Sequence, residues 1–356
     1  MGQKPQWAVL LLVLIGAAPV LLADVSADQL TKAGHWKRAR TVVEAALKQN
    51  PRDAHLLMLM ARVQRAYGKL DEAQRSAEQA VAIDPKSWEA HWELGQVYAE
   101  QINKVSFLKK MGMAGNIRKE FEAAEAATAN QFETHYALMS FYMEAPGMAG
   151  GDKNKARAEQ MEVAKLSPAW GYLAELDLTP KDKRAAAQEE LYRKAHDAAR
   201  AEEYSSLVPY CNFLAAQKRW EEAEKCSADL VKRAADRVTG YSLLAVIYAS
   251  QSRWKELDSV IAEAEKNVPD NLNPEFQAAR TLAEAGMELP RAERYLRNYL
   301  KQEPEPKYPL LSRAHYRLGQ VLAKSGSKTE AIAELQMALK LEPDLKPAAE
   351  ELKKLQ

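Results

Sequence analysis

The chain has 356 residues, enough for two or three ordinary domains or for one elongated array of repeats. Lysine and arginine (50) almost balance aspartate and glutamate (49), so the formal net charge is only +1. This balance argues against nucleic acid as a partner, because general nucleic-acid binding needs a cationic surface. Glycine (15) and proline (16) are scarce, which favours a helical protein.

The first 27 residues differ in composition from the rest of the chain. Lys4 precedes an apolar run from Trp7 to Leu22, and small residues follow. This order is typical of a signal peptide that is removed after Ala23 or after Ala27. The apolar run is shorter than the ~20 residues of a membrane-spanning helix. We therefore expect a periplasmic or secreted protein, with an uncleaved membrane anchor as the alternative.

Four landmarks after this segment recur 34 residues further along the chain. Gly34, Ala39, Ala46 and Pro51 return as Gly68, Ala73, Ala80 and Pro85. Such a period, with small residues inside and proline at the end, predicts helix-turn-helix repeats that stack into a solenoid. We divide the chain into a signal peptide (1–27), N-terminal repeats (28–100), a degenerate region (101–203), and C-terminal repeats with a capping helix (204–356).

The third repeat unit carries a recognisable motif, Leu94-Gly95 followed by Tyr98. Leu318, Gly319, Gly326, Ala331 and Pro343 form a second clear copy near the end of the chain. These residues resemble the signature of the tetratricopeptide repeat (TPR) superfamily. The resemblance implies an all-α, right-handed superhelical solenoid of about eight or nine helical hairpins. It also implies a protein-binding scaffold and not an enzyme.

Two segments of the degenerate region depart from the TPR pattern. The insertion 101–119 carries five basic residues and no acid from Lys104 to Lys119, and the segment 144–156 is rich in glycine. Their Phe-Leu-Lys-Lys-Met-Gly and Ala-Pro-Gly-x-x-Gly-Gly sequences resemble a set of exported bacterial TPR proteins. That resemblance implies a bacterial source and a periplasmic address, and it implies no activity.

Each departure allows two interpretations. The insertion is either a helix that lies on an anionic membrane through Lys109 and Lys110, or a flap over the solenoid. We favour the flap, because Gly112 and Gly115 weaken a continuous helix. The glycine-rich loop either binds an anion beside Lys153 and Lys155 or serves as a structural turn or docking loop, which we favour. Asp152 is a candidate cap for the next helix.

The remaining chemistry is sparse. Cys211 and Cys226 lie about equally far from a turn near Lys218, so they form either a disulfide or two buried apolar positions. His91, His135 and His315 occupy inner positions of repeats, where we expect packed rings and not ligands. We expect no metal, no cofactor and no catalytic residues, because the spacings of a zinc site or a nucleophile-base set are missing.

The concave groove is the predicted binding surface. Aromatic residues take equivalent places in four repeats, and aromatic and arginine side chains commonly anchor protein interfaces. The alternative is that about half of these side chains are partly buried between repeats. We predict a scaffold of the bacterial envelope that binds an unidentified peptide or protein, or else a peripheral membrane tether or assembly factor that uses residues 104–119. The sequence leaves the oligomeric state open. The predicted groove residues are Met58, Arg62, Arg65, Trp92, Gln96, Tyr136, Phe276, Arg280, Arg313, Tyr316 and Gln320, with His55 and Asn212 beside them.

Overall fold

The computed structural model describes residues 26–128 and 130–356. Residues 1–25 of the predicted signal peptide lie outside this described part, which contains nineteen α-helices and two short 3-10 helices. The α-helices in chain order are α1 (Ala27–Ala33), α2 (Trp36–Gln49), α3 (Ala54–Ala66), α4 (Leu70–Ile83), α5 (Trp88–Gln101), α6 (Phe107–Ala127), α7 (Phe132–Glu144), α8 (Lys153–Leu166), α9 (Pro168–Leu178), α10 (Lys181–Ala198), α11 (Tyr204–Ala216), α12 (Trp220–Arg233), α13 (Val238–Ser250), α14 (Trp254–Asn267), α15 (Asn273–Ala285), α16 (Leu289–Tyr299), α17 (Leu311–Lys324), α18 (Lys328–Leu341) and α19 (Lys346–Leu355).

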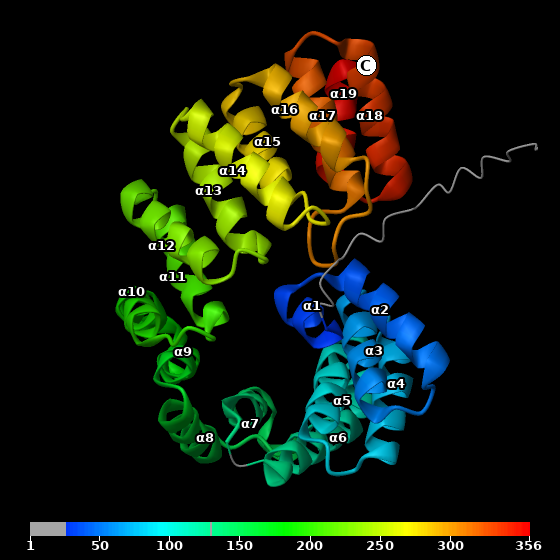
Figure 1. Cartoon of the computed structure of the whole chain (residues 1–356), viewed down its shortest axis with the longest axis vertical. Helices are drawn as coiled ribbons and strands as arrows, with labels where there is room; N and C mark the ends of the chain where they lie inside the picture. The colour runs from blue at the N-terminus through cyan, green and yellow to red at the C-terminus, as the bar shows by residue number, and fades with distance from the viewer. Residues whose placement is uncertain (1–25, 129) are drawn as a thin grey trace, which may run out of the picture.

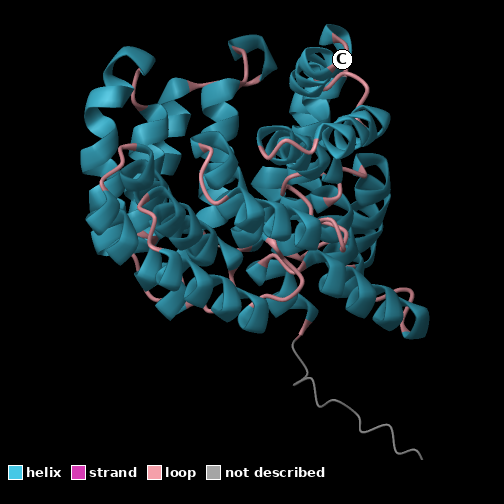
Figure 2. Cartoon of the chain, turned by 90° about the horizontal axis from the view of Figure 1, so that it is seen from above, coloured by secondary structure: helices cyan, strands magenta, loops and turns pink. Residues whose placement is uncertain are grey.

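The helices pack as successive pairs, from α1–α2 to α17–α18, and α19 covers the last pair. The pairs follow one another around a ring, seen along its shortest axis in Figure 1. The view from above shows helices joined by loops throughout the described part (Figure 2). This architecture confirms the predicted all-α solenoid of helix-turn-helix repeats.

The landmark residues have local roles that explain their spacing. Gly34, Gly68 and Gly326 stand in the turns between paired helices with φ of 87°, 71° and 85°. Such left-handed backbone suits glycine, which has no Cβ to clash. Ala39 and Ala73 are fully buried at the start of the second helix of each pair. Small side chains there let the two helices of a pair approach closely.

The C-terminal half has one extended core. Buried residues form a single cluster from Val238 in α13 to Ala331 in α18. Gly319 in α17 shows how tightly this part packs, because a Cβ at that position would lie 2.7 Å from Leu335 Cγ. Each pair therefore buries its apolar stripe against the next pair, as expected when repeats contribute mainly through nearest neighbours.

The first repeat also contacts the C-terminal half across the ring. His35 Nδ1 lies 2.8 Å from Asp270 Oδ2, and His35 Nε2 lies 2.7 Å from the carbonyl oxygen of Asp236. The backbone N–H of Lys37 donates to Glu305 Oε2 over 3.2 Å. These links join residues more than 200 positions apart, and we call His35, Lys37, Asp270 and Glu305 the closing contact. They turn the open solenoid into a closed ring (Figure 1).

Burial and neighbouring charges change the pKa values of His35 and Glu305 in the closing contact. Burial by itself would lower the pKa of His35, but the hydrogen bond and the charge of Asp270 outweigh it and raise that pKa above 6.5. Burial raises the pKa of Glu305 to about 7. Its side chain is only 1% exposed. Glu305 of the closing contact therefore titrates near neutral pH.

A disulfide joins two neighbouring helices, and a capping box stabilises the start of α1. Cys211 in α11 and Cys226 in α12 are joined by a disulfide. At the start of α1, the Ser26 hydroxyl accepts from the Gln29 N–H, and the Gln29 side chain accepts from the Ser26 N–H, which together form a capping box. Cleavage of a signal peptide after Ala23 would leave this cap in place, whereas cleavage after Ala27 would remove it.

Candidate functional site

A large cavity of the described part lies on the inner side of the ring, in the middle region. Its volume is about 1080 Å³, and its walls come from α5, α6, α7 and α9 and from the loop that follows α7. Charged residues of α1, of the α10–α11 turn and of the α12–α13 turn complete it. A concave, largely apolar space with a few polar groups is typical of a binding site.

Aromatic side chains form one wall of this cavity. Phe132 of α7 stacks on Trp170 of α9, with ring centroids 5.3 Å apart, and Tyr136 meets the edge of the same indole at 5.4 Å. The Tyr136 hydroxyl donates to the Asp177 carboxylate. Burial and this bond raise the pKa of Tyr136 far above its usual value, so the phenol stays protonated. The wall is therefore rigid, apolar and uncharged.

The insertion supplies the opposite wall and corrects the flap interpretation. It forms the N-terminal half of the continuous 21-residue helix α6, despite Gly112 and Gly115. Ala114, Ile117 and Phe121 are each at most 4% exposed. Burying this apolar face offsets the ~1 kcal/mol that each helical glycine costs.

The cationic residues of the insertion are only partly available to a membrane. Lys109 is exposed, whereas Lys110 lines the cavity. Arg118 and Lys119 pair with acidic neighbours at 3.7 Å and 3.6 Å. Ala114, Ile117 and Phe121 of this helix pack inside the protein, with Met113 against them, so these side chains are not free to enter a lipid surface.

The glycine-rich loop closes one end of the cavity through Ala145, Pro146 and Ala149. Gly151 is needed here, because a Cβ would lie only 1.8 Å from the Ala145 carbonyl oxygen. The Asp152 carboxylate accepts from the backbone N–H groups of Asn154 and Lys155 and caps α8. This loop is therefore a structural element of the cavity.

The same cap argues against anion binding at the start of α8. The N–H groups that an anion would use already bind the Asp152 carboxylate. Lys153 and Lys155 are exposed and do not line the cavity, and the Lys155 ammonium lies 5.2 Å from the centre of the Tyr142 ring. The structure therefore does not bring these two lysines together into an anion site.

Two residues that line the cavity carry a buried polar atom with no partner in the described part of the chain. Among the described residues, Trp92 Nε1 and Glu133 Oε2 are buried atoms without a hydrogen-bond partner. Burial raises the pKa of Glu133, against the lowering effect of the Lys32 charge. Because an unmade hydrogen bond is costly in a buried place, each atom requires a partner that the described residues do not supply.

The structure separates the predicted groove residues into different environments. Trp92, Gln96 and Tyr136 line the cavity, as does Lys110. Arg62 and Arg65 are instead held by the buried Glu93 carboxylate, with Arg62 Nε 3.2 Å from Glu93 Oε2.

The groove prediction is wrong for Met58 and Phe276. Their side chains are 1% and 4% exposed, so they cannot contact a partner. Both point into the core between helices, where Phe276 packs on Tyr299 with centroids 5.1 Å apart. The helical period places them only one position from the inner stripe, too close for sequence to distinguish the two faces.

The remaining predicted groove residues lie in the C-terminal half, outside the cavity. Arg280 is partly buried, and its Nε lacks a partner within the described residues. Arg313 is exposed and pairs with Glu342 at 2.6 Å. Gln320 donates to the Tyr316 hydroxyl over 2.8 Å. His55 and Asn212 are exposed, and neither lines the cavity.

Four aromatic residues of the cavity were not predicted: Phe121, Phe132, Phe141 and Trp170. The available signal was the density of aromatic residues between positions 121 and 170, with Phe132 and Tyr136 one helical turn apart. This signal lay in the region where the repeat pattern was degenerate, and Tyr136 was the one groove position assigned there.

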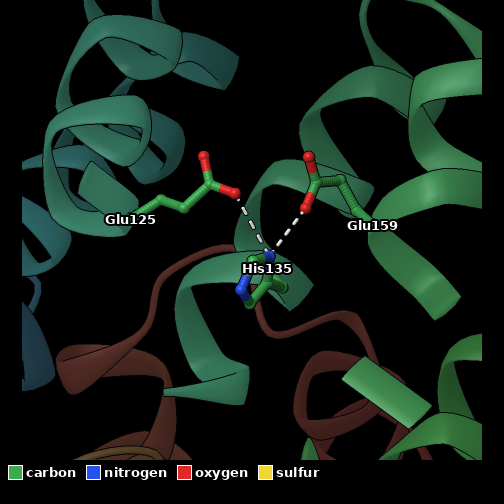
Figure 3. A group of neighbouring side chains, drawn as sticks. All are labelled: Glu125, His135 and Glu159. Atoms are coloured by element: carbon green, nitrogen blue, oxygen red, sulfur yellow. Dashed lines mark hydrogen bonds and ion pairs between the residues drawn. The ribbon is translucent and has the colours of Figure 1, made fainter. Parts of the chain in front are cut away.

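One group of side chains has the composition of a metal site, and it lies outside the cavity. Glu125, His135 and Glu159 converge from α6, α7 and α8 (Figure 3).

None of the helices in the described part combines the length and the apolar composition of a membrane span.

The comparisons with known proteins point to one repeat family. Two family models, each described as a tetratricopeptide repeat, match residues 30–94 and 276–348. No curated protein matches the chain significantly. Among solved structures, TTC0263, a thermophilic TPR protein of Thermus thermophilus, is 22% identical over 53% of this chain and 95% of its own, with a TM-score of 0.45.

Two other solved structures extend over more of the chain. Yeast Tom70 is 13% identical over 92% of this chain and 79% of its own, with a TM-score of 0.46. The human IFIT1 dimer with m7Gppp-AAAA is 15% identical over 92% and 79%, with a TM-score of 0.48. The two family matches coincide with α1–α5 and α15–α19 of the solenoid, and the chain belongs to the tetratricopeptide repeat superfamily.

Proposed function

We propose that this protein is a non-enzymatic scaffold of the bacterial envelope that binds a peptide segment of a partner protein in the cavity of about 1080 Å³. TPR repeats indicate a protein-interaction scaffold. The observation that carries the finer proposal is the cavity itself, because the regular repeats pack tightly while the two departures from the pattern leave an aromatic space on the inner side of the ring.

The chemistry of the cavity favours a peptide as the occupant. A peptide bond carries both a carbonyl acceptor, which suits Trp92 Nε1, and an N–H donor, which suits Glu133 Oε2. The wall of Phe132, Tyr136 and Trp170 suits apolar or aromatic side chains of that peptide. Rigid aromatic anchors of this kind dominate the binding energy of protein interfaces.

Peptides selected from a displayed library on the wild-type protein test this proposal. Tyr136→Ala is expected to weaken their binding about tenfold or more, as loss of an interface anchor does. Tyr316→Ala is the matched control, because Tyr316 takes the equivalent position in a repeat outside the cavity. Trp92→Phe keeps the aromatic surface and removes only the N–H donor, so we expect a smaller loss.

Equal binding by the wild type and the Tyr136→Ala variant, with helical spectra unchanged, would exclude the cavity as the peptide site. If Tyr316→Ala weakens binding as much as Tyr136→Ala, the binding surface extends over the whole inner face and the cavity has no special role.

The envelope location rests on the sequence of residues 1–27, and the Cys211–Cys226 disulfide supports it, because disulfides persist in oxidising compartments. We expect the exported protein to begin at Asp24, since this leaves Ser26 in place as the cap of α1. Terminal sequencing of protein from the periplasmic fraction checks this. An intact Met1 on protein recovered from the membrane fraction would point to the anchored form instead.

A further inference from the structure

Three side chains from three helices meet at His135. Its Nδ1 lies 2.8 Å from Glu159 Oε2 of α8 and 3.2 Å from Glu125 Oε1 of α6 (Figure 3). One ligand atom from each residue lies within 4.8 Å of the other two. His135 is 8% exposed, so packing fixes the position of its ring. The arrangement joins the third repeat (α5–α6) to the fourth (α7–α8).

Two other histidines show what an ordinary pair looks like in this protein. His91 Nδ1 lies 2.6 Å from Glu120 Oε2, and His315 Nδ1 lies 2.6 Å from Glu334 Oε2. In both, a histidine on the first helix of a repeat meets one glutamate on the second helix. In each, one hydrogen bond from Nδ1 to one carboxylate accounts for the pairing, and His91 Nε2 also lies 3.1 Å from the Pro85 carbonyl oxygen.

At His135 a second carboxylate approaches the same nitrogen. A ring N–H at Nδ1 points to one acceptor, so the hydrogen bond to Glu159 at 2.8 Å leaves Glu125 without a donor of its own from the ring. The third side chain is therefore not explained by the pairing seen in the other two repeats. A cation in place of the proton would be shared by all three atoms.

The charges around the three side chains also favour a bound cation. The charge of Glu122 also acts on Glu125, and the charge of Glu162 acts on both Glu125 and His135. The nearby cations are engaged on those outer carboxylates, with Lys165 Nζ 2.6 Å from Glu162 Oε1 and Arg118 Nε 3.7 Å from Glu122 Oε1. Glu125 and Glu159 therefore face each other across one imidazole, and the pocket between them has an excess of negative charge.

We propose that Glu125, His135 and Glu159 bind a divalent transition-metal ion of the Zn²⁺ class. One imidazole nitrogen and two carboxylate oxygens suit such an ion, and three protein ligands leave a position for water. The ion would tie α6 to α7 and α8 across the boundary between two repeats. It would also hold the aromatic wall in position, because Phe132 and Tyr136 lie on α7 within one turn of His135.

Titration of the full-length exported chain with Zn²⁺ tests the site, after chelator treatment and without a histidine tag. We expect one Zn²⁺ per chain by calorimetry and a higher melting temperature with Zn²⁺, because an ion that binds only the folded state stabilises it. Mg²⁺ at the same concentration should have little effect, since it prefers an all-oxygen site with several waters.

Glu125→Gln is the decisive variant, because it leaves the His135–Glu159 pair as it is in the other repeats and should fold normally. We expect it to weaken Zn²⁺ binding more than ~10-fold, and His135→Gln to abolish the one-to-one binding. Glu334→Gln, which alters the matched pair at His315, should bind Zn²⁺ as the wild type does.

Two results would overturn the proposal. The first is the absence of one-to-one Zn²⁺ binding by the wild-type chain. The second is binding that Glu125→Gln and His135→Gln leave unchanged, which would assign the ion to adventitious surface carboxylates.

Discussion

The C-terminal repeats and the middle region are built from the same unit, yet they differ in how completely they pack. From α13 to α18 one buried cluster continues through successive pairs, and at Gly319 the absence of a side chain lets α17 and α18 touch. From α5 to α9 the lengthened helix α6 and the loop after α7 leave a cavity of about 1080 Å³. Regular spacing thus produces a filled core, and departures from it produce space for a ligand.

The same comparison suggests that the C-terminal repeats mainly determine stability and that the middle region mainly determines binding. In the C-terminal repeats the large side chains meet each other, so little apolar surface is left for a partner. In the middle region Trp92, Phe132, Tyr136 and Trp170 meet only in part and face the cavity. We therefore expect mutations in the C-terminal repeats to alter the free energy of unfolding, and mutations in the middle region to alter binding.

The largest expected effect is the loss of a buried side chain in the C-terminal core. Leu282 in α15 is fully buried, so Leu282→Ala should lower the free energy of unfolding by about 2–5 kcal/mol. Leu166 is the matched control, because it is only partly buried and lines the cavity. Leu166→Ala enlarges an existing space and should cost much less. Chemical denaturation followed by circular dichroism measures both, and equal losses would show that the two regions pack alike.

A pair of glycine substitutions should change stability in opposite directions. Gly319→Ala places a methyl group against the buried Leu335 and should cost about 1–3 kcal/mol. Gly112→Ala meets no atom within 4 Å and should stabilise α6 by about 0.5–1 kcal/mol, because alanine is the better helix former. Thermal unfolding of the two variants compares them directly. Destabilisation by Gly112→Ala would mean that the insertion is not a continuous helix in solution.

The smallest change in stability is expected at the closing contact, and this change depends on pH. His35 has a raised pKa in the folded protein, so its contribution is complete below pH 6.5 and is lost as the pH rises through the folded value. Glu305, with a pKa of about 7 instead of 4.5, is protonated when buried, so it too loses stability as the pH rises toward 7. Asp270 has a lowered pKa and opposes them only in acid.

The ring should therefore be more open at pH 8 than at pH 5.5. Small-angle scattering should show a larger radius of gyration at pH 8 with an unchanged helical spectrum. Lys37 and Arg38 supply the other charges near these groups. His35→Gln should reduce the pH dependence of the radius. A radius that is the same at both pH values in the wild type would show that the contact does not control the shape.

Much of the candidate site was beyond the reach of sequence for identifiable reasons. Trp92 and Tyr136 were predicted because they take equivalent places on the first helices of their repeats. Phe121 was missed because it lies on the second helix of its repeat, and Trp170 was missed because the repeats are degenerate there. Their place in the cavity depends on α6, α7 and α9 together. Met58 and Phe276 were assigned to the groove, although one position of helical rotation puts them in the core.

The sequence by itself determined the helices and the order in which they pair. Glycine at left-handed turns, alanine between close helices and proline after each pair act locally or between neighbours, so a period of 34 residues carries that information. Only the tertiary structure decided the cavity, the meeting of Glu125, His135 and Glu159, and the closing contact between His35 and Asp270. These features depend on the accumulated rotation of many repeats, which brings distant segments together and leaves no periodic signal in the sequence.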